Sequence, residues 1–294
     1  MTTSPLPGCP VCARPATLLY PATTDDRDRL HRPEQFVCTS LEVSDHGDIF
    51  QCSSCQLGFI APTPSPAELS RLYGGGQDPD YLAQESGRRA TWERVVRKTI
   101  GPGTGRQLLD VGAHTGIFAD VAAKNGWAVT GVEPNDWARS IASQQFGVTS
   151  RRSIDELGHA RYDVVTMFDV IEHMTDPLAE LQRLHRLLNP GGRLILTTPD
   201  LGSPVARLLR SRWYCIRQQH LFYFNPTSIR TVLERSGFKL VSLQRYHRTF
   251  SIGYWLNRLA TFLRFRWLAH RVARWSRLVT IPTNDEMLIV AERL

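Results

Sequence analysis

The feature that most constrains the fold of this chain is the alternation of short apolar runs with helical stretches over residues 106–200. Apolar runs occupy 107–111, 128–132, 162–168 and 193–198, with a weaker run near Val148. Apolar residues recur at helical spacing between them, most clearly over 117–125 and 177–188. Strands that alternate with helices of this length form βαβ units with right-handed crossovers. We therefore expect an α/β fold built on a parallel sheet.

A glycine turn follows the first of these runs. Gly112 and Gly116 delimit it, and such a turn lets the main chain approach a ligand at the carboxyl end of a strand. Glu133 ends the second run, where a carboxylate can accept hydrogen bonds from both hydroxyls of a ribose. The turn lacks the dinucleotide pattern G-x-G-x-x-G, and the carboxylate of Asp110 favours a cationic ligand over a pyrophosphate. An adenosyl ligand with an amino-acid tail and a sulfonium fits better than NAD.

These residues resemble those of class I S-adenosylmethionine-dependent methyltransferases. Leu109–Gly116 is similar to the first motif of that family, and Glu133 to its acid after the second strand. Phe168–Pro177 and Leu187–Gly192 resemble motifs of the branch that contains quinone-biosynthesis methyltransferases. The resemblance covers about residues 65–240. It implies a Rossmann-like domain with a seven-stranded, mostly parallel sheet, to which runs at 238–243 and 287–291 supply the last strands.

The resemblance also implies which residues contact S-adenosylmethionine. Turn residues are expected at the methionine end, Glu133 at the ribose and Ile154 at the adenine, whereas Phe168 and Asp169 lie near the sulfonium. The expected set is Tyr81, Asp110, Gly112, Ala113, His114, Gly116, Glu133, Ile154, Phe168 and Asp169.

Two parts of this expected set carry alternatives. Tyr73 and Tyr81 resemble aromatic residues of a lid that closes over the cofactor, but both could equally pack helices together. His114 stands where family members usually carry glycine, so its ring must point away from the cofactor or line the pocket of its tail. A tolerated bulky turn residue explains His114 better than a catalytic one.

Two C-x-x-C pairs near the N-terminus predict a metal site. The pairs are Cys9 with Cys12 and Cys52 with Cys55, and two such turns complete a closed tetrahedral zinc site. Disulfides are the alternative, but they are rare in a cytosolic chain. Cys38 could replace one ligand, although a buried apolar role suits it better. We therefore predict a structural Zn²⁺ ion.

The Pro-rich run that ends near residue 66 predicts a domain boundary. We expect a zinc-binding domain over 1–62, a helical lid or linker over 63–100 and the methyltransferase domain over 101–294. Such an N-terminal domain is similar to that of bacterial methyltransferases of glycan and natural-product biosynthesis. The His-Asn-x-x-His loop of the sugar C-methyltransferases in that group is absent after the fifth strand.

His173 and His220 are the candidate catalytic bases. Methyl transfer to a hydroxyl group needs a base near neutral pKa, for which histidine is the first choice. His173 follows the fourth strand, and His220 precedes a capped helix. Either could instead be structural, and Glu172, Tyr223 and His247 are weaker candidates.

Basic residues are concentrated near the C-terminus. The chain carries a net charge of +7, yet residues 201–280 contain fourteen arginines and one lysine against one acid. An amphipathic helix is predicted over about 254–280, within a basic insertion over about 245–280, with Phe265, Trp275 and Val279 on its apolar face. Such a helix suits a membrane surface or lipid phosphates. Packing of its apolar face on the core, with solvated arginines outside, is the equal alternative.

Together these patterns predict a zinc-bearing methyltransferase that O-methylates a small-molecule, glycan or lipid-linked anionic acceptor. An RNA methyltransferase is the main alternative, because the basic segment suits phosphates, but the cysteine segment lacks interleaved basic and aromatic residues. A sugar C-methyltransferase and a non-catalytic protein with the same fold are further alternatives. No signal-like leader and no apolar stretch of 18 residues is present. We expect a cytoplasmic protein, with membrane contact through the basic helix.

Overall fold

A seven-stranded sheet forms the centre of the computed structural model, which describes residues 6–23, 39, 46–65, 68–69, 76–262 and 275–294. Its strand order is β10-β13-β8-β7-β4-β5-β6. These strands are β4 (Gln107–Val111), β5 (Ala128–Val132), β6 (Ser150–Arg151), β7 (Tyr162–Phe168), β8 (Leu188–Pro199), β10 (Phe238–Arg245) and β13 (Glu286–Arg293). β13 runs antiparallel to both of its neighbours, and the other pairs are parallel. The predicted mostly parallel sheet is confirmed.

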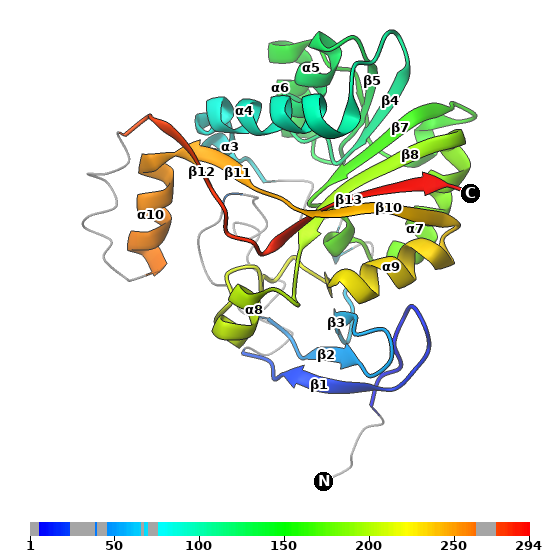
Figure 1. Ribbon diagram of the computed structural model, residues 1–294, viewed down its shortest axis with the longest axis vertical. Coiled ribbons are helices and arrows are strands. Elements are labelled where there is room, and N and C mark those ends of the chain that lie inside the picture. The colour runs from blue at the N-terminus through cyan, green and yellow to red at the C-terminus, as the bar shows by residue number, and fades with distance from the viewer. Residues whose placement is uncertain (1–5, 24–38, 40–45, 66–67, 70–75, 263–274) are drawn as a thin grey trace.

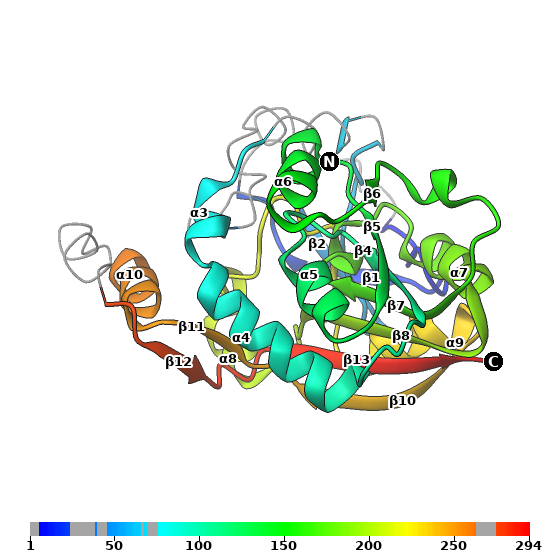
Figure 2. The same cartoon turned by 90° about the horizontal axis from the view of Figure 1, so that it is seen from above.

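Helices cover both faces of this sheet (Figure 1). The helices are α3 (Pro79–Ala83), α4 (Glu85–Val95), α5 (Ile117–Lys124), α6 (Asp136–Phe146), α7 (Pro177–Leu187), α8 (Pro204–Leu209), α9 (Pro226–Arg235) and α10 (Ile252–Phe262). One turn of π-helix, η2 (Val96–Ile100), continues α4, and short 3₁₀ turns form η3 (Ile154–Leu157), η4 (Ile171–His173) and η5 (Arg210–Arg212). The view from above shows α4 and α5 on the opposite side of the sheet from α7 and α9 (Figure 2).

Alternating strand residues supply the two apolar layers. Leu108 and Val164 pack in a cluster with residues of α4 and α5. Their neighbours Leu109 and Val165 belong to a second cluster with α7 and α9. Because both faces are covered, the central strands are apolar at nearly every position, which explains the uninterrupted runs in the sequence.

A second sheet contains the cysteine segment. Its order is β1 (Ala16–Tyr20), β2 (Ile49–Cys52), β3 (Gly58–Ile60) and β9 (Phe222–Tyr223). β9 follows the fifth strand of the methyltransferase core by more than twenty residues, and it pairs antiparallel with β3. The N-terminal segment and the core therefore share one sheet, although the boundary at residue 62 stays a prediction.

The C-terminal excursion corrects one prediction. α10 ends at Phe262, residues 263–274 lie outside the described part of the chain, and Leu278–Ile281 forms β12. β12 pairs antiparallel with β11 (Arg248–Ser251), and both protrude with α10 beside the main sheet (Figure 1). The predicted helix is therefore wrong at its C-terminal end. The adjacent β-branched residues of β12 favour a strand, and pairing with β11 satisfies its main chain.

The remaining predictions about helices and single residues have the following outcomes. Of the helix predicted over 67–73, residues 68 and 69 are described and helical, whereas Tyr73 and the cysteine at position 38 lie outside the described residues. The predicted helix over 87–100 is confirmed as α4 with η2. Nowhere in the described chain does a helix combine the length and apolar character that a bilayer crossing requires.

Candidate active site

Two buried carboxyl groups lie at the carboxyl ends of β4 and β5. Asp110 is 3% exposed, and the Thr166 hydroxyl donates to its Oδ1 at 2.8 Å. Burial raises the pKa of Asp110 to about 7, and the nearby charge of Glu133 adds to this, whereas the Thr166 hydrogen bond lowers it. The ionisation of Asp110 near pH 7 therefore depends on the charges and hydrogen bonds of the groups beside it.

Glu133 closes the same end of the sheet. Its carboxylate accepts hydrogen bonds from the main-chain N–H of His114 at 2.9 Å and of Asn135 at 2.8 Å. Burial raises its pKa, although these N–H groups and Arg139 oppose the rise. Within the described residues, neither Glu133 nor Asp110 takes part in an ion pair. Two buried carboxyl groups without a cation suit a positively charged ligand such as S-adenosylmethionine.

The glycine turn between β4 and α5 is shaped by close packing. Gly112 and Gly116 have φ of +77° and +82°, which favours glycine. A Cβ atom on Gly112 would lie 2.4 Å from Cγ2 of Val170, and one on Gly116 would lie 3.0 Å from Cβ of Ala142. Packing against Val170 and Ala142 therefore leaves no room for a side chain at Gly112 or Gly116.

An aromatic stack lies at this turn. The rings of Tyr81 and His114 have centroids 3.9 Å apart, and the guanidinium of Arg88 lies 3.5 Å from the Tyr81 centroid. Burial lowers the pKa of His114 to about 3, with Arg88 contributing, so this ring is neutral. Its Nδ1 is buried and has no hydrogen-bond partner within the described residues. The structure thus places Tyr81, from α3, against the glycine turn.

The remaining expected cofactor residues have different surroundings. Ile154 begins η3 just after β6 and packs on the apolar core. The ring of Phe168 stacks on Trp92 at 4.5 Å and meets Phe118 edge-on at 4.8 Å. The ring of Phe168 therefore packs in the apolar layer between the sheet and α4. Only the main chain of Phe168 lies at the carboxyl end of β7.

Asp169 directly follows β7 in a left-handed conformation, with φ of +55°. Its Oδ1 accepts a hydrogen bond from the Thr197 hydroxyl at 2.9 Å, and its Oδ2 forms an ion pair with Arg248 at 2.6 Å. Arg248 also reaches Glu286 at 2.7 Å. Burial raises the pKa of Glu286 to about 7, although Arg248 opposes the rise.

Arg248 is a site residue that the sequence did not reveal. It comes from β11, 79 positions beyond Asp169, and no local pattern around it marks a function. The excess of arginine over residues 201–280 was the one available signal. That signal pointed to a segment and could not distinguish this arginine from its neighbours.

The two predicted bases lie together, and Glu172 lies with them. One ligand atom each of Glu172, His173 and His220 falls within 4.8 Å of the other two. The two imidazole rings meet edge to face, with centroids 4.7 Å apart. Glu172 and His173 lie in η4 after β7, whereas His220 lies just before β9. The fold therefore assembles one cluster from two distant segments.

Burial sets the charges in this cluster. It raises the pKa of Glu172 well above its usual range, helped by Asp169, and lowers the pKa of His173 to about 4. The pKa of His220 falls well below its ordinary value through burial, with His173 contributing. Both imidazoles are therefore neutral near pH 7.

Hydrogen bonds distinguish the members of this cluster. Nδ1 of His173 lies 2.8 Å from the carbonyl of Gln219, and the Thr198 hydroxyl donates to Oε2 of Glu172 at 3.0 Å. Oε1 of Glu172 and Nδ1 of His220 are buried and have no hydrogen-bond partner within the described part of the chain. These two atoms can receive a proton or a ligand. Two imidazoles and a carboxylate are also a donor set suited to a divalent metal.

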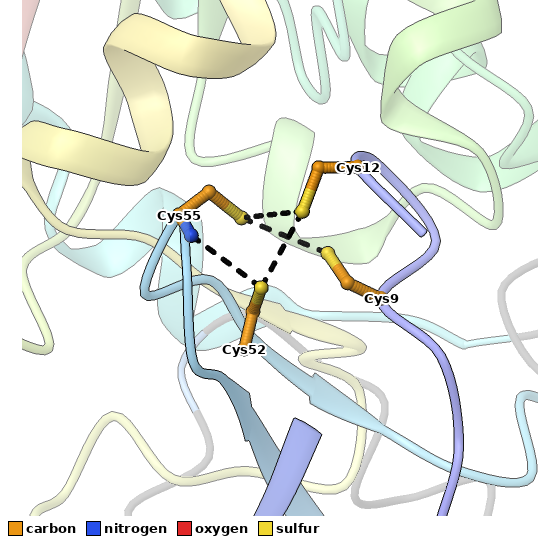
Figure 3. A group of neighbouring side chains, drawn as sticks. All are labelled: Cys9, Cys12, Cys52 and Cys55. Carbon is orange, nitrogen blue, oxygen red and sulfur yellow. Dashed lines mark hydrogen bonds between the residues drawn. The ribbon is translucent and has the colours of Figure 1, made fainter. Parts of the chain in front are cut away.

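The four cysteines converge as predicted (Figure 3). Their sulfur atoms lie 3.6 Å apart for Cys9 and Cys55, 3.4 Å for Cys12 and Cys52, and 3.7 Å for Cys12 and Cys55. A tetrahedral zinc site with bonds of about 2.3 Å places its sulfurs about 3.8 Å apart. A disulfide needs about 2.05 Å. The side chains therefore fit a closed four-thiolate metal site.

This sheet order, with carboxyl groups at the ends of β4 and β5, defines the class I S-adenosylmethionine-dependent methyltransferases. The resemblance found in the sequence is confirmed. The profile of the methyltransferase domain family matches residues 84–243, more than half of the chain, and the chain belongs to that family.

Individual relatives agree over shorter stretches. The chain is similar to the "Ubiquinone biosynthesis O-methyltransferase" of Alkalilimnicola ehrlichii, with 32% identity over 112 residues, which cover 35% of this chain and 45% of that protein. For the protein of the same name from Leptothrix cholodnii, identity is 32% over 146 residues, covering 45% and 61%. The chain thus spans about half the length of the curated relatives it matches.

A solved structure supports the fold. A SAM dependent methyltransferase from Archaeoglobus fulgidus superposes with a TM-score of 0.51 and 17% sequence identity, covering 74% of this chain and 100% of that one. At this identity the likeness shows the fold alone.

Proposed function

We propose that this chain transfers a methyl group from S-adenosylmethionine to a hydroxyl group of a small-molecule, glycan or lipid-linked acceptor. The observation that carries the proposal is the cluster of Glu172, His173 and His220 just after β7. It places a neutral base close to the end of the sheet where Asp110 and Glu133 suit a cationic ligand. Relatives of this chain are named as O-methyltransferases, which favours oxygen as the acceptor atom.

S-adenosylmethionine, when bound, supplies a methyl group activated by a positively charged sulfur. Glu133 would hold the ribose, since each of its oxygens has a second lone pair beyond the main-chain bond it already accepts. Asp110 would face the positive charge at the methionine end. The glycine turn would let the main chain approach the same end. The chain thus supplies orientation and charge, which is most of what methyl transfer asks of a protein.

His220 is the base in this proposal. A hydroxyl acceptor must lose its proton as its oxygen becomes methylated, and Nδ1 of His220 is buried without a partner within the described residues. Burial lowers the pKa of His220, which keeps the imidazole neutral but makes it a weaker base, so its position rather than its basicity supports this role. His173, held by the Gln219 carbonyl, packs against the ring and orients it.

The cysteine cluster would hold a structural zinc ion. All four ligands come from the protein, so a tetrahedral site is closed and leaves no position for a substrate. Metal analysis of the purified chain should give about one zinc per chain. A content far below this would remove the zinc assignment.

The acceptor side of the proposal includes an anionic partner at a membrane surface. Trp275 and Leu259 are 58% and 52% exposed, and Leu278 and Ile281 of β12 are also exposed. Arg277 lies between Trp275 and Leu278 in the sequence, and residues 201–280 contain fourteen arginines and one acid. Exposed apolar side chains among arginines suit an anionic lipid surface. Co-sedimentation with vesicles should require phosphatidylserine in the phosphatidylcholine and should weaken in Trp275→Ala.

RNA is the competing partner for this basic segment, because arginines also bind phosphates. A sugar C-methyl transfer competes for the chemistry. Each alternative predicts a methylated product that differs from the product of O-methylation. Incubation with methyl-tritiated S-adenosylmethionine and, separately, catechols, hydroxybenzoates, nucleotide sugars, lipid extract and RNA should label a hydroxylated compound. Label in RNA or on a sugar carbon would replace the proposal.

The role of His220 is tested with the acceptor that this screen identifies. His220→Asn should lower kcat by about 100-fold or more, as expected for loss of a positioned base. The affinity for S-adenosylmethionine, measured by calorimetry, should not change. His159→Asn is the matched control, because His159 is exposed and lies outside the cluster of three. An unchanged kcat in His220→Asn would show that another group accepts the proton. Loss of activity on adding a chelator while the cysteine-bound zinc stays in place would instead favour a metal on the same three donors.

A further inference from the structure

One residue connects the cysteine segment to the candidate bases. The main-chain N–H of Ile60, in β3, donates to the carbonyl of Leu221 at 3.0 Å. The N–H of Leu221 donates in turn to the carbonyl of Glu172 at 2.7 Å. Leu221 directly follows His220. The segment Gln219–Asn225, which we call the strap, is therefore hydrogen-bonded on one side to the cysteine segment and on the other to η4.

The pairing of β3 with β9 depends on a glycine. Gly58 faces Tyr223 across the pair, and a Cβ atom at position 58 would lie 2.9 Å from Cβ of Tyr223 and 3.0 Å from Cδ2 of Leu201. A larger residue must therefore push β3 away from the strap. The metal-ligand turn ends immediately before this strand, since the N–H of Cys52 donates to the carbonyl of Leu57 at 2.9 Å.

Side chains reinforce the same junction. The Asn225 amide donates to the main-chain carbonyl of Gln56 at 3.3 Å, and Arg235 of α9 donates to the carbonyl of Val11 at 3.1 Å. Val11 and Gln56 lie inside or next to the two C-x-x-C turns. The cysteines Cys9, Cys52 and Cys55 also belong to the apolar cluster that contains Leu221 and Phe222. Both turns are thus anchored on the strap or on the helix that follows it.

We propose that the cysteine segment, residues 6–23 and 46–62, positions His220 and so forms one wall of the acceptor site. A metal ion on the four cysteines fixes both turns, and the second turn fixes β3. β3 holds the strap, and the strap holds His220 against His173 and Glu172. The role of His220 in this inference rests on the proposed function, but the mechanical coupling does not. The hydrogen bonds that join β3, the strap and η4 do not include β4 or β5, although Leu109, Val111 and Val132 share the apolar cluster with the cysteines. We therefore expect the cofactor end to respond less to the metal than the strap does.

The test compares Gly58→Val with Gly8→Ala in the full chain. Gly8 lies beside Cys9, and a Cβ atom there would meet no atom closer than 3.9 Å, so Gly8→Ala is a matched control in the same segment. Amide hydrogen exchange should rise about tenfold or more over 217–225 in Gly58→Val, whereas exchange over 107–116 and the zinc content should not change. Gly8→Ala should match the unaltered chain in all three measurements.

Metal extraction gives a second measurement that needs no variant. Removal of the metal from the unaltered chain by a chelator should raise exchange over 217–225 and move the imidazole Cε1–H signals of His173 and His220 in NMR spectra. Calorimetric binding of S-adenosylhomocysteine should remain. Because this readout needs no acceptor, it can fail or succeed whether or not the proposed O-methylation is correct.

Two results would overturn the coupling. Protection of 217–225 that survives both Gly58→Val and metal extraction would show that the strap is held without the cysteine segment. Exchange that rises equally over 107–116, with loss of S-adenosylhomocysteine binding, would show that the segment supports the whole fold rather than the acceptor site.

Discussion

The cofactor end and the acceptor end of this site are built in different ways. Asp110, the glycine turn and Glu133 lie within 24 consecutive residues of one βαβ unit. The proposed acceptor end combines η4 and the strap, which lie far apart in the chain and are joined by the fold. The first end is fixed by the main sheet. The second also depends on a cysteine segment at the opposite end of the sequence.

Because of this difference, the acceptor end can vary between proteins while the cofactor end stays the same. A compact unit with required glycines and buried carboxyl groups can recognise one cofactor in many proteins. An acceptor end built from inserted segments can change without disturbing it. The two ends should therefore respond separately to substitution, and three predictions test that separation.

The largest effect is expected for Glu133→Ala. The substitution removes the carboxylate that accepts the His114 and Asn135 N–H groups, and with it the expected ribose acceptor. Affinity for S-adenosylmethionine should fall about 100-fold or more, equivalent to about 2.7 kcal/mol. Calorimetry measures it, with His220→Asn as the control at the other end. An unchanged affinity would refute the ribose assignment, and an equal loss in the control would remove the separation of the two ends.

An intermediate effect is expected from pH. Burial raises the pKa of Asp110 to about 7, so the unliganded protein gains stability from the protonated carboxyl group at low pH and loses it as pH rises through 7. A cationic ligand prefers the ionised group. Affinity for S-adenosylmethionine should therefore increase about tenfold between pH 6 and pH 8, because the ionised fraction of a group with a pKa of about 7 rises about tenfold over this range.

Asp110→Asn serves as the control for this pH effect. The amide keeps the shape of the side chain but cannot ionise, so its affinity should be lower and should not vary with pH over the same range. A pH dependence that persists in Asp110→Asn would assign the titration to another group.

The smallest effect is expected for Arg248→Gln. This arginine joins Asp169 to Glu286 through partly buried ion pairs, and its loss should lower the free energy of unfolding by about 1 kcal/mol. Arg248→Lys should recover part of that loss, because it keeps the charge but not the forked geometry. Chemical denaturation measures both. A loss of S-adenosylmethionine affinity larger than the loss of stability would place Arg248 at the cofactor end instead.

The sequence predicted the main sheet correctly, and it singled out the residues proposed for the cofactor end, because both have local signals. Buried parallel strands appear in the sequence as apolar runs. The turn requires glycine at Gly112 and Gly116, because φ is positive and a Cβ atom would be crowded at both positions. The convergence of the four cysteines could also be predicted, because a metal site requires a characteristic spacing of its ligands.

The acceptor end could be predicted only in part. His173 and His220 were each identified as candidate bases, but nothing in the sequence indicated that they meet, because β9 is a two-residue strand. Arg248 carried no local signal. The helix predicted through Thr280 failed at β12 because pairing with β11 outweighs helical periodicity there.

The most direct test of the central claim is a calorimetric titration of the unaltered chain with S-adenosylmethionine. The structure predicts saturable binding at one site per chain, lost in Glu133→Ala and retained when the metal is extracted from the cysteines. Absence of binding by a folded chain with its zinc content intact would contradict the claim that this protein is a working methyltransferase.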